Sequence, residues 1–208
     1  MHVTKIVITG GPCGGKSSAL VRVKEHFEAR GYTVLTISEV ATELIEGGIA
    51  PWTCGSYADF QRVKILLQEK KEQLYVEAAQ TMSADRVLIV CDRGSLDSLA
   101  YASKTLWLDT IGQYGLTEED VIHGYGAVFH LVTAAKGAES SYTTANNTAR
   151  RETPEEAARL DDLTLDAWAG HPYRRVIDNS TDFEGKLARL CLEIERFLEQ
   201  REQTRFSE

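Results

Sequence analysis

The sequence predicts an α/β protein with an open, mainly parallel sheet of five strands flanked by helices. Two observations favour this class. Short apolar runs rich in β-branched residues alternate with longer segments of helical periodicity, an order typical of parallel sheets. A cluster of glycines also joins the first apolar run directly to an amphipathic segment. The 208 residues contain no internal repeat, no low-complexity linker and no second apolar core, so one domain spanning 1–208 is expected.

The expected elements follow from the period of the apolar positions. Strands are predicted at 5–9, 32–38, 86–92, 127–133 and 174–178. Helices are predicted from 16 to about 30, over 39–80 with a break at 47–56, through 96–100 and from about 183 onward. A short helix is also predicted near 117–120, where Thr117 with Asp120 three residues later forms a capping pattern.

The charge balance limits the partners that the protein can have. The formal net charge is −8, with 26% charged and 43% hydrophobic residues. An acidic surface repels polyanions, so a nucleic-acid partner is not expected, although a local basic pocket remains compatible with this charge. No apolar run approaches the ~18 residues of a membrane span. The first strand begins within a few residues of Met1, so we expect no signal peptide and a cytoplasmic location.

The cysteines and histidines show no pattern typical of a metal or disulfide site. The four cysteines are scattered without a CxxC pair, and the five histidines include no HExxH motif. A small anionic ligand that brings its own magnesium ion therefore fits the composition better than a protein-built zinc site.

Residues 10–18 read GGPCGGKSS and match the GxxxxGK[ST] pattern of the phosphate-binding P-loop. The glycines allow backbone N–H groups to point inward at phosphate, and the following helix adds the positive end of its dipole. Lys16 would reach the β- and γ-phosphates of Mg²⁺-bound ATP or GTP, Ser17 would bind the magnesium ion, and Ser18 would contact an α-phosphate. Both flanks, a strand and an amphipathic helix, disfavour a plain glycine-rich turn. The predicted nucleotide-binding residues are Gly10, Gly11, Pro12, Cys13, Gly14, Gly15, Lys16, Ser17 and Ser18.

Polar residues at the ends of the second and third predicted strands form the expected catalytic group. Ligands of open parallel sheets lie beyond the carboxyl ends of the strands. Asp92 ends the apolar run of the third strand, where it would hold magnesium with Ser17 or accept the proton of an acceptor hydroxyl. Glu39, after the second strand, competes with Asp92 for the role of base. Arg93, beside Asp92, is a further catalytic candidate.

Each of these residues also has a purely structural alternative. Asp92 would cap the next helix, and Arg93 would form a surface ion pair of little energetic value. Glu39 would be a solvated loop residue. Asp97 is expected either in an acceptor pocket or on a solvated helix face.

The segment 136–162 changes composition sharply and predicts a lid. Ser, Thr and Asn crowd its first half, and Arg150 and Arg151 follow just before a strong helix start at 153–156. A lid at about 136–153 would close its arginines over the transferring phosphate and exclude water. Alternatively, the two arginines pair with neighbouring glutamates on the surface.

Three aromatic residues, Trp52, Tyr57 and Phe60, lie close together in the sequence after the predicted break. They would either form the wall of a site for a planar or lipidic acceptor or belong to the core. The core role is the commoner one for aromatics at this spacing.

Several stretches together resemble one family of P-loop proteins. They are ITGGPCGGKSSAL, SEVATELI, CDRGSLDSLAY, FHLVTAAKGAESSY, RRETPEEAARLDD and GHPYRRVIDNS. The sequence is similar, over 3–198, to the kinase-like AAA-type ATPase family that groups the ribosylnicotinamide-kinase domain with a GTP- and phosphatidic-acid-binding translocation protein. The P-loop alone is generic, whereas the TAAKGAE…RRET and GHP…VIDNS blocks are more specific.

The resemblance implies a nucleoside- or nucleotide-kinase-like fold in which the Walker strand lies beside the P-loop strand. It implies an acidic-Arg motif at Asp92 and Arg93 and a base at Glu39. It also implies lid arginines at 150 and 151 and a nucleotide-base contact near Asn179 and Asp182.

Three functions are compatible with these features. The first is Mg²⁺-dependent transfer of the γ-phosphate of ATP or GTP to a small nucleoside- or nucleotide-like acceptor. The second is a nucleotide-dependent switch, a slow GTPase or ATPase that binds a protein or lipid partner. The third is a polynucleotide kinase, which the acidic balance disfavours. A placed base and an acceptor cavity would distinguish the first from the second, because a switch needs neither.

Overall fold

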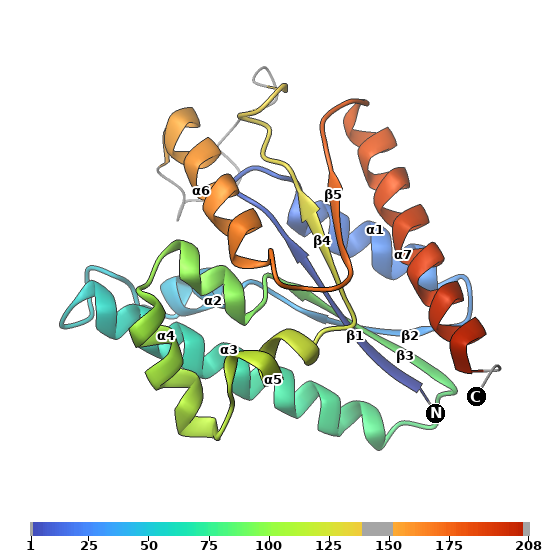
Figure 1. Cartoon of the computed structure of the whole chain (residues 1–208), viewed down its shortest axis with the longest axis horizontal. Helices are drawn as coiled ribbons and strands as arrows, with labels where there is room; N and C mark the ends of the chain where they lie inside the picture. The colour runs from blue at the N-terminus through green and yellow to red at the C-terminus, as the bar shows by residue number, and fades with distance from the viewer. Residues whose placement is uncertain (1, 139–151, 206–208) are drawn as a thin grey trace.

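The structure, a computed structural model, describes residues 2–138 and 152–205 (Figure 1). Within these residues, five strands form one all-parallel sheet in the order β2-β3-β1-β4-β5. The predicted α/β class with an open five-stranded sheet is confirmed, and the strand bounds shift by at most three residues. The strands are β1 (His2–Thr9), β2 (Thr33–Ile37), β3 (Arg86–Asp92), β4 (Ala127–Leu131) and β5 (Arg174–Ile177).

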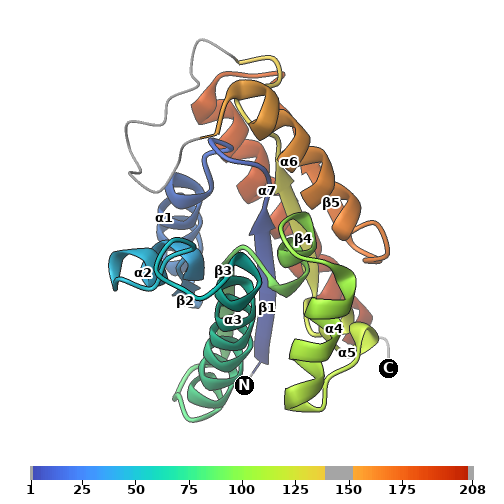
Figure 2. The same cartoon turned by 90° about the vertical axis from the view of Figure 1, so that its left-hand side faces the viewer.

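Helices cover both faces of the sheet. α1 and α7 pack on one face, and α3, α4 and α5 pack on the other (Figure 1, Figure 2). None of the helices in the described ranges is long and apolar enough to cross a lipid bilayer. The helices are α1 (Lys16–Glu28), α2 (Val40–Glu46), α3 (Tyr57–Gln80), α4 (Lys104–Ile111), α5 (Glu118–His123), α6 (Pro154–Ala167) and α7 (Phe183–Arg205), with 3-10 helices η1 (Ser95–Ala100) and η2 (Gly112–Tyr114).

Apolar side chains alternate between the two faces along the central strand β1. Ile6 and Ile8 join the core cluster under α1 and α7, whereas Val7 joins the cluster under α3, α4 and α5. The neighbouring strand β3 is buried over six consecutive residues, from Val87 to Asp92. Burial on both faces explains why β3 reads as an unbroken apolar run in the sequence.

The register brings the carboxyl ends of the central strands to one edge of the sheet. Ile8 pairs with Asp92 across β1 and β3, and Ile37 pairs with Cys91 across β2 and β3. The loop that follows β1 therefore begins beside the end of β3. This is the neighbourhood that the kinase-like resemblance implied for the Walker strand.

Most local predictions are confirmed, and the segment after β3 is the exception. Thr117 and Thr153 cap α5 and α6 as expected, and the break at 47–56 separates α2 from α3. The helix predicted through 96–100 is a 3-10 helix, and at its start the Asp97 carboxylate accepts the Gly94 N–H at 2.8 Å. The regular helix α4, which follows it, was not predicted.

Candidate active site

The glycine-rich loop between β1 and α1 lies against the end of β4. Gly10 has a φ of 134°, and a Cβ atom on it would lie 2.1 Å from the carbonyl oxygen of Leu131. Gly15 has a φ of 88°, and a Cβ atom there would lie 2.5 Å from the ring of Phe183. Only glycine fits at these two positions, so the fold requires these loop glycines in addition to any ligand.

Asp161, on α6, holds the base of this loop. Its Oδ1 accepts the N–H of Gly11 at 2.8 Å and the N–H of Thr133 at 3.1 Å. His130 Nε2 lies 3.1 Å from the same oxygen, and Lys136 donates to Oδ2 at 3.1 Å. Although burial alone raises the pKa of Asp161, the hydrogen bonds from His130, Gly11 and Lys136 outweigh it and hold this pKa well below its ordinary value.

Sequence reasoning missed Asp161, although a signal for it exists. The side chain is 2% exposed and lies on the buried face of α6 with Ala157 and Thr164. A carboxylate four residues after one buried position and three before another has to find hydrogen-bond donors elsewhere in the fold. Its position on the helix therefore pointed to a structural role.

The P-loop lysine is folded onto its own loop. Lys16 is 2% exposed, and its Nζ donates to the carbonyl oxygens of Gly10 at 3.0 Å and Gly11 at 2.8 Å. The remaining predicted phosphate contacts belong to the same loop and the first turn of α1, where Ser17 and Ser18 are exposed. The α1 N-terminus and the ammonium of Lys16 thus give this end of the sheet a local positive charge.

The two predicted magnesium ligands lie side by side. Ser17 Oγ is 3.5 Å from Asp92 Oδ2, and Asp92 is 3% exposed at the end of β3. Mg²⁺ in nucleotide sites takes hydroxyl and carboxylate oxygens together with phosphate oxygens and water, so this donor set fits it. Within residues 2–138 and 152–205, no cluster of three or more His, Cys, Asp or Glu side chains is placed to hold a metal by itself.

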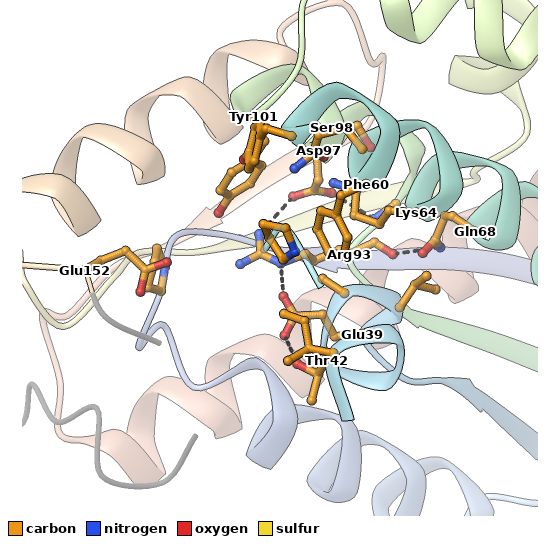
Figure 3. A pocket seen from close by; sticks show the side chains of 18 of the residues that line it. Glu39, Thr42, Phe60, Lys64, Gln68, Arg93, Asp97, Ser98, Tyr101 and Glu152 are labelled. Carbon is orange, nitrogen blue, oxygen red and sulfur yellow. Dashed lines mark hydrogen bonds and ion pairs between the residues drawn. The ribbon is translucent and has the colours of Figure 1, made fainter. Parts of the chain in front are cut away.

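Arg93 and Glu39 form an ion pair inside the crevice rather than on the surface (Figure 3). The backbone of Arg93 has a φ of 70°, an uncommon conformation that turns the side chain back across the strand ends. Its Nε donates to Glu39 Oε1 and its Nη1 donates to the Gly10 carbonyl oxygen at 3.1 Å. The other oxygen of Glu39 accepts from Thr42 Oγ1 at 2.9 Å. Arg93 therefore links the P-loop to the end of β2.

Asp97 is buried and does not lie on a solvated helix face. It is 2% exposed, and Thr9 Oγ1 donates to its Oδ1. Its Oδ2 accepts from the Gly94 N–H at 2.8 Å and from Trp168 Nε1 at 3.2 Å. Its carboxylate also lies 3.6 Å from Arg93 Nη1, on the opposite side of the guanidinium from Glu39 (Figure 3). Asp97 therefore positions η1 and helps to orient Arg93.

A cavity of about 240 Å³ opens between the P-loop, α2, α3 and η1. Pro12 of the P-loop lines this cavity together with Glu39 and Arg93. Its apolar wall consists of Ile45, Trp52, Tyr57, Phe60 and Tyr101.

The three aromatics of 50–61 therefore divide between the two roles expected for them. Phe60 is 3% exposed and belongs to the core as well as to the cavity wall. Trp52 and Tyr57 are 64% and 49% exposed, respectively, and also line the cavity.

Asn179 and Asp182 lie after β5 and make structural hydrogen bonds. The Asn179 amide donates to the carbonyl oxygens of Thr133 at 2.9 Å and Lys136 at 2.7 Å, which ties the segments after β4 and β5 together. Asp182 Oδ1 accepts the Gly185 N–H at 2.8 Å at the start of α7. A contact of either residue with the nucleotide base stays a prediction.

The predicted lid at about 136–153 is described only at its two ends. Arg150 and Arg151 lie outside the described residues. Their predicted role on the transferring phosphate therefore remains a prediction.

Three features together define a P-loop NTPase domain. They are a parallel sheet with β3 beside β1, a glycine-rich phosphate loop that leads into α1, and an acidic residue at the end of the neighbouring strand. The comparison with known families agrees with this class. A family model described as an AAA domain matches residues 5–186, so the chain belongs to this family. No curated protein matches the sequence significantly. Nucleotide binding by a P-loop domain, with Mg²⁺ as the usual companion of the nucleotide, follows from this membership.

Proposed function

We propose that this domain transfers the γ-phosphate of Mg²⁺-bound ATP or GTP to a hydroxyl group of a small acceptor that binds in the cavity between α2, α3 and η1. The observation that carries the proposal is the position of this cavity. Its lining includes Pro12 of the P-loop and the Arg93–Glu39 pair, so an acceptor there would lie next to a nucleotide held by the loop. A switch that only senses nucleotide needs no such cavity. The kinase-like resemblance of the sequence supports the same direction.

The nucleotide side of the reaction rests on three residues. Lys16 would exchange its hydrogen bonds with the loop carbonyls for the β- and γ-phosphate oxygens. Ser17 and Asp92 would hold Mg²⁺, which supplies neutralising charge to the phosphates when it is bound. This assignment leaves Asp92 to the metal, and it agrees with the absence of Asp92 from the described cavity lining.

Glu39 is then the carboxylate that meets the acceptor. It lines the cavity, and its two oxygens already accept from Arg93 and Thr42. Each carboxylate oxygen has a further lone pair, so Glu39 can also accept the proton of an acceptor hydroxyl. Phosphoryl transfer through a loose transition state depends more on positioning than on a strong base. A carboxylate fixed by two neighbours is suited to that task.

Arg93 is the proposed link between the two halves of the site. Its guanidinium contacts the P-loop carbonyl of Gly10 and the carboxylate of Glu39. A fixed guanidinium at this junction would stabilise charge that develops on the transferring phosphoryl group. The lid arginines, Arg150 and Arg151, are proposed to act on the same charge.

The test is Mg²⁺-dependent consumption of ATP and GTP, with and without pooled nucleosides, nucleotides and vitamins, with Lys16→Ala as the blank. Turnover that rises with one pool and disappears in the variant supports the kinase. Tight nucleotide binding with hydrolysis that no pool accelerates would contradict it and favour a switch.

A further inference from the structure

The cavity contains one cationic side chain that is not used by the P-loop or by the Arg93–Glu39 pair. This is Lys64 on α3, which lies beside Phe60 on the cavity wall (Figure 3). Within the described residues, its Nζ makes no hydrogen bond and no ion pair, and it lies 5.2 Å from the centroid of the Tyr101 ring. Lys64 is half-buried, and an ammonium group held partly away from water without a counter-ion favours an anionic partner.

Three carboxylates line the cavity, those of Glu39, Asp97 and Glu152, and the two that act on the charge of Lys64, Glu39 and Asp97, are already engaged by other groups. Glu39 pairs with Arg93 and accepts from Thr42. Asp97 accepts from Thr9, from the Gly94 N–H and from Trp168. Neither carboxylate approaches Lys64 closely enough for an ion pair, so Lys64 has no dedicated anion in the described part of the site.

Gln61 supplies a second and independent observation. It lies one helical turn before Lys64 on the same face of α3 and lines the same cavity. Gln61 is 3% exposed, and its Oε1 is buried without a hydrogen-bond partner. An amide oxygen in that position costs free energy unless a donor from a ligand or a water molecule reaches it.

We propose that the acceptor carries an anionic group, a carboxylate or a phosphate, that binds Lys64, and an N–H or O–H group that donates to Gln61 Oε1. The identification of this molecule as the phosphate acceptor rests on the proposed function, whereas the anion site is inferred from the cavity alone. The apolar wall of Ile45, Phe60 and Tyr101 would take the planar or apolar body of the same molecule. The substrate class is therefore a small hydroxylated anion with a ring, rather than a neutral or cationic one.

The pH dependence of binding should follow Lys64. Burial, and then repulsion by Arg93, lower its pKa to about 8, against the opposing effects of Asp97 and Glu39. Because the lysine loses its charge progressively as the pH rises through that value, the affinity for an anionic acceptor should be nearly full at pH 7 and fall as the pH rises past 8. Tyr101 also faces the ammonium, and its own pKa is raised, chiefly by burial, so it remains neutral in this range.

The experiment compares matched probes on the whole chain. Nucleosides, their 5′-monophosphates and their 5′-carboxylates are titrated by calorimetry in the absence of nucleotide, and then assayed as acceptors with Mg²⁺-ATP and Mg²⁺-GTP. The variants are Lys64→Met, Lys64→Arg, Gln61→Leu and, as a matched control, Lys70→Met, which removes an exposed lysine from the same helix. Thermal melts identify any variant that fails to fold.

The proposal predicts that at least one charged probe binds ten or more times tighter than its uncharged parent, and the phosphate and carboxylate arms identify the group. Lys64→Met should weaken that binding by about 30-fold or more, while Lys64→Arg should retain most of it and lose the decline above pH 8. Gln61→Leu should weaken it several-fold, and Lys70→Met should leave it unchanged.

Three results would overturn the anion site. In the first, charged probes bind no better than their uncharged parents. In the second, Lys64→Met lowers the affinity for neutral and charged probes equally. In the third, no charged probe binds. The two proposals can fail separately. Charged probes that bind through Lys64 but never receive phosphate would support the anion site and contradict the kinase.

Discussion

The P-loop and the acceptor cavity share the edge of one sheet but are built in opposite ways. The loop is a contiguous stretch, and its shape depends on backbone groups and on close contacts that exclude any Cβ atom at Gly10 and Gly15. The cavity is lined by side chains that range from Pro12 to Glu152. The chain itself thus fixes the shape of the loop, whereas the cavity includes a buried polar atom, Gln61 Oε1, that the described residues leave without a hydrogen bond.

The partners of the polar groups differ in the same way. Below the loop, the carboxylate of Asp161 receives hydrogen bonds from Gly11, Thr133 and Lys136 and is internally satisfied. In the cavity, by contrast, Gln61 Oε1 accepts no hydrogen bond and Lys64 forms no ion pair within the described residues. This difference indicates that the loop is tuned for a common ligand, a polyphosphate, and that the cavity is tuned for a particular one.

The largest effect is expected from Lys16→Ala. Removing the ammonium should lower turnover of ATP and GTP by about 10³-fold, because a preorganised positive charge acts on the transferring phosphoryl group. Steady-state assays measure this loss, and Lys24→Ala on the exposed face of α1 is the control. Retention of more than a tenth of the activity would show that the loop is not the catalytic phosphate site.

Asp161→Ala should destabilise the fold by about 3 kcal/mol, because it leaves the buried N–H groups of Gly11 and Thr133 without their acceptor. Denaturant unfolding measures the change. Asp162→Ala is the matched control, since Asp162 is 67% exposed and its pair with Lys136 should contribute less than about 1 kcal/mol. We call this set of hydrogen bonds from Gly11 and Thr133 to Asp161 the Asp161 clamp. Equal destabilisation by the two variants would show that the clamp does not stabilise the fold.

The Asp161 clamp also predicts how stability depends on pH. Because hydrogen bonds to the charged form depress the pKa of Asp161, its contribution is complete above the ordinary aspartate pKa of about 4. The contribution is lost as the pH falls toward the depressed value in the folded state. The wild type should therefore lose more stability between about pH 5 and pH 2 than Asp161→Ala does. Parallel acid unfolding curves for the two proteins would argue against the clamp.

Glu39→Gln tests the cavity side of the comparison. The substitution removes the charge opposite Arg93 and the acceptor for the substrate proton, so acceptor-dependent transfer should fall by about 10²-fold. Nucleotide affinity at the P-loop should not change. Glu43→Gln on α2 is the control, because Glu43 is exposed and pairs with Lys71 away from the crevice. A joint loss of nucleotide binding and transfer would mean that Glu39 serves the loop instead.

The smallest effect is expected from Trp52→Ala. Trp52 lines the cavity and is 64% exposed, so the indole covers only part of an acceptor. Losing this contact should raise the KM for the acceptor about fivefold with kcat unchanged, which corresponds to about 1 kcal/mol of aromatic contact. Leu74→Ala, at an exposed position of α3 away from the cavity, controls for general effects. A change in kcat alone would place Trp52 outside the acceptor site.

Much of the fold was predictable because its signals are local. The buried strands appear as apolar runs, and the P-loop pattern is contiguous. The strand order that brings Asp92 beside Ser17 was expected only from the resemblance to the kinase-like family. The caps of α5 and α6 followed from threonines three residues before an acidic side chain.

The rest of the site depends on partners that are distant in the sequence. Asp97 reads as a polar helix residue, but its partners Thr9 and Trp168 are 88 and 71 positions away. Asp161 and the N–H of Gly11 are 150 positions apart. Hydropathy patterns show which residues prefer water, but they do not show which charged groups the fold will satisfy internally. For that reason, the hydrogen-bond partners of these two carboxylates and the ion pair of Arg93 with Glu39 became visible only in three dimensions, even though the place of Asp161 on the apolar face of α6 indicated its burial.

The central claim is that phosphate passes from the nucleotide at the loop to a hydroxyl group in the cavity. The most direct test supplies ATP or GTP with an isotope-labelled γ-phosphate, Mg²⁺ and the best-binding acceptor, and then identifies labelled products by mass spectrometry. The account predicts labelled phosphate on the acceptor and none on the acceptor in Lys16→Ala. Label found only in inorganic phosphate, with the acceptor bound but unmodified, would contradict it.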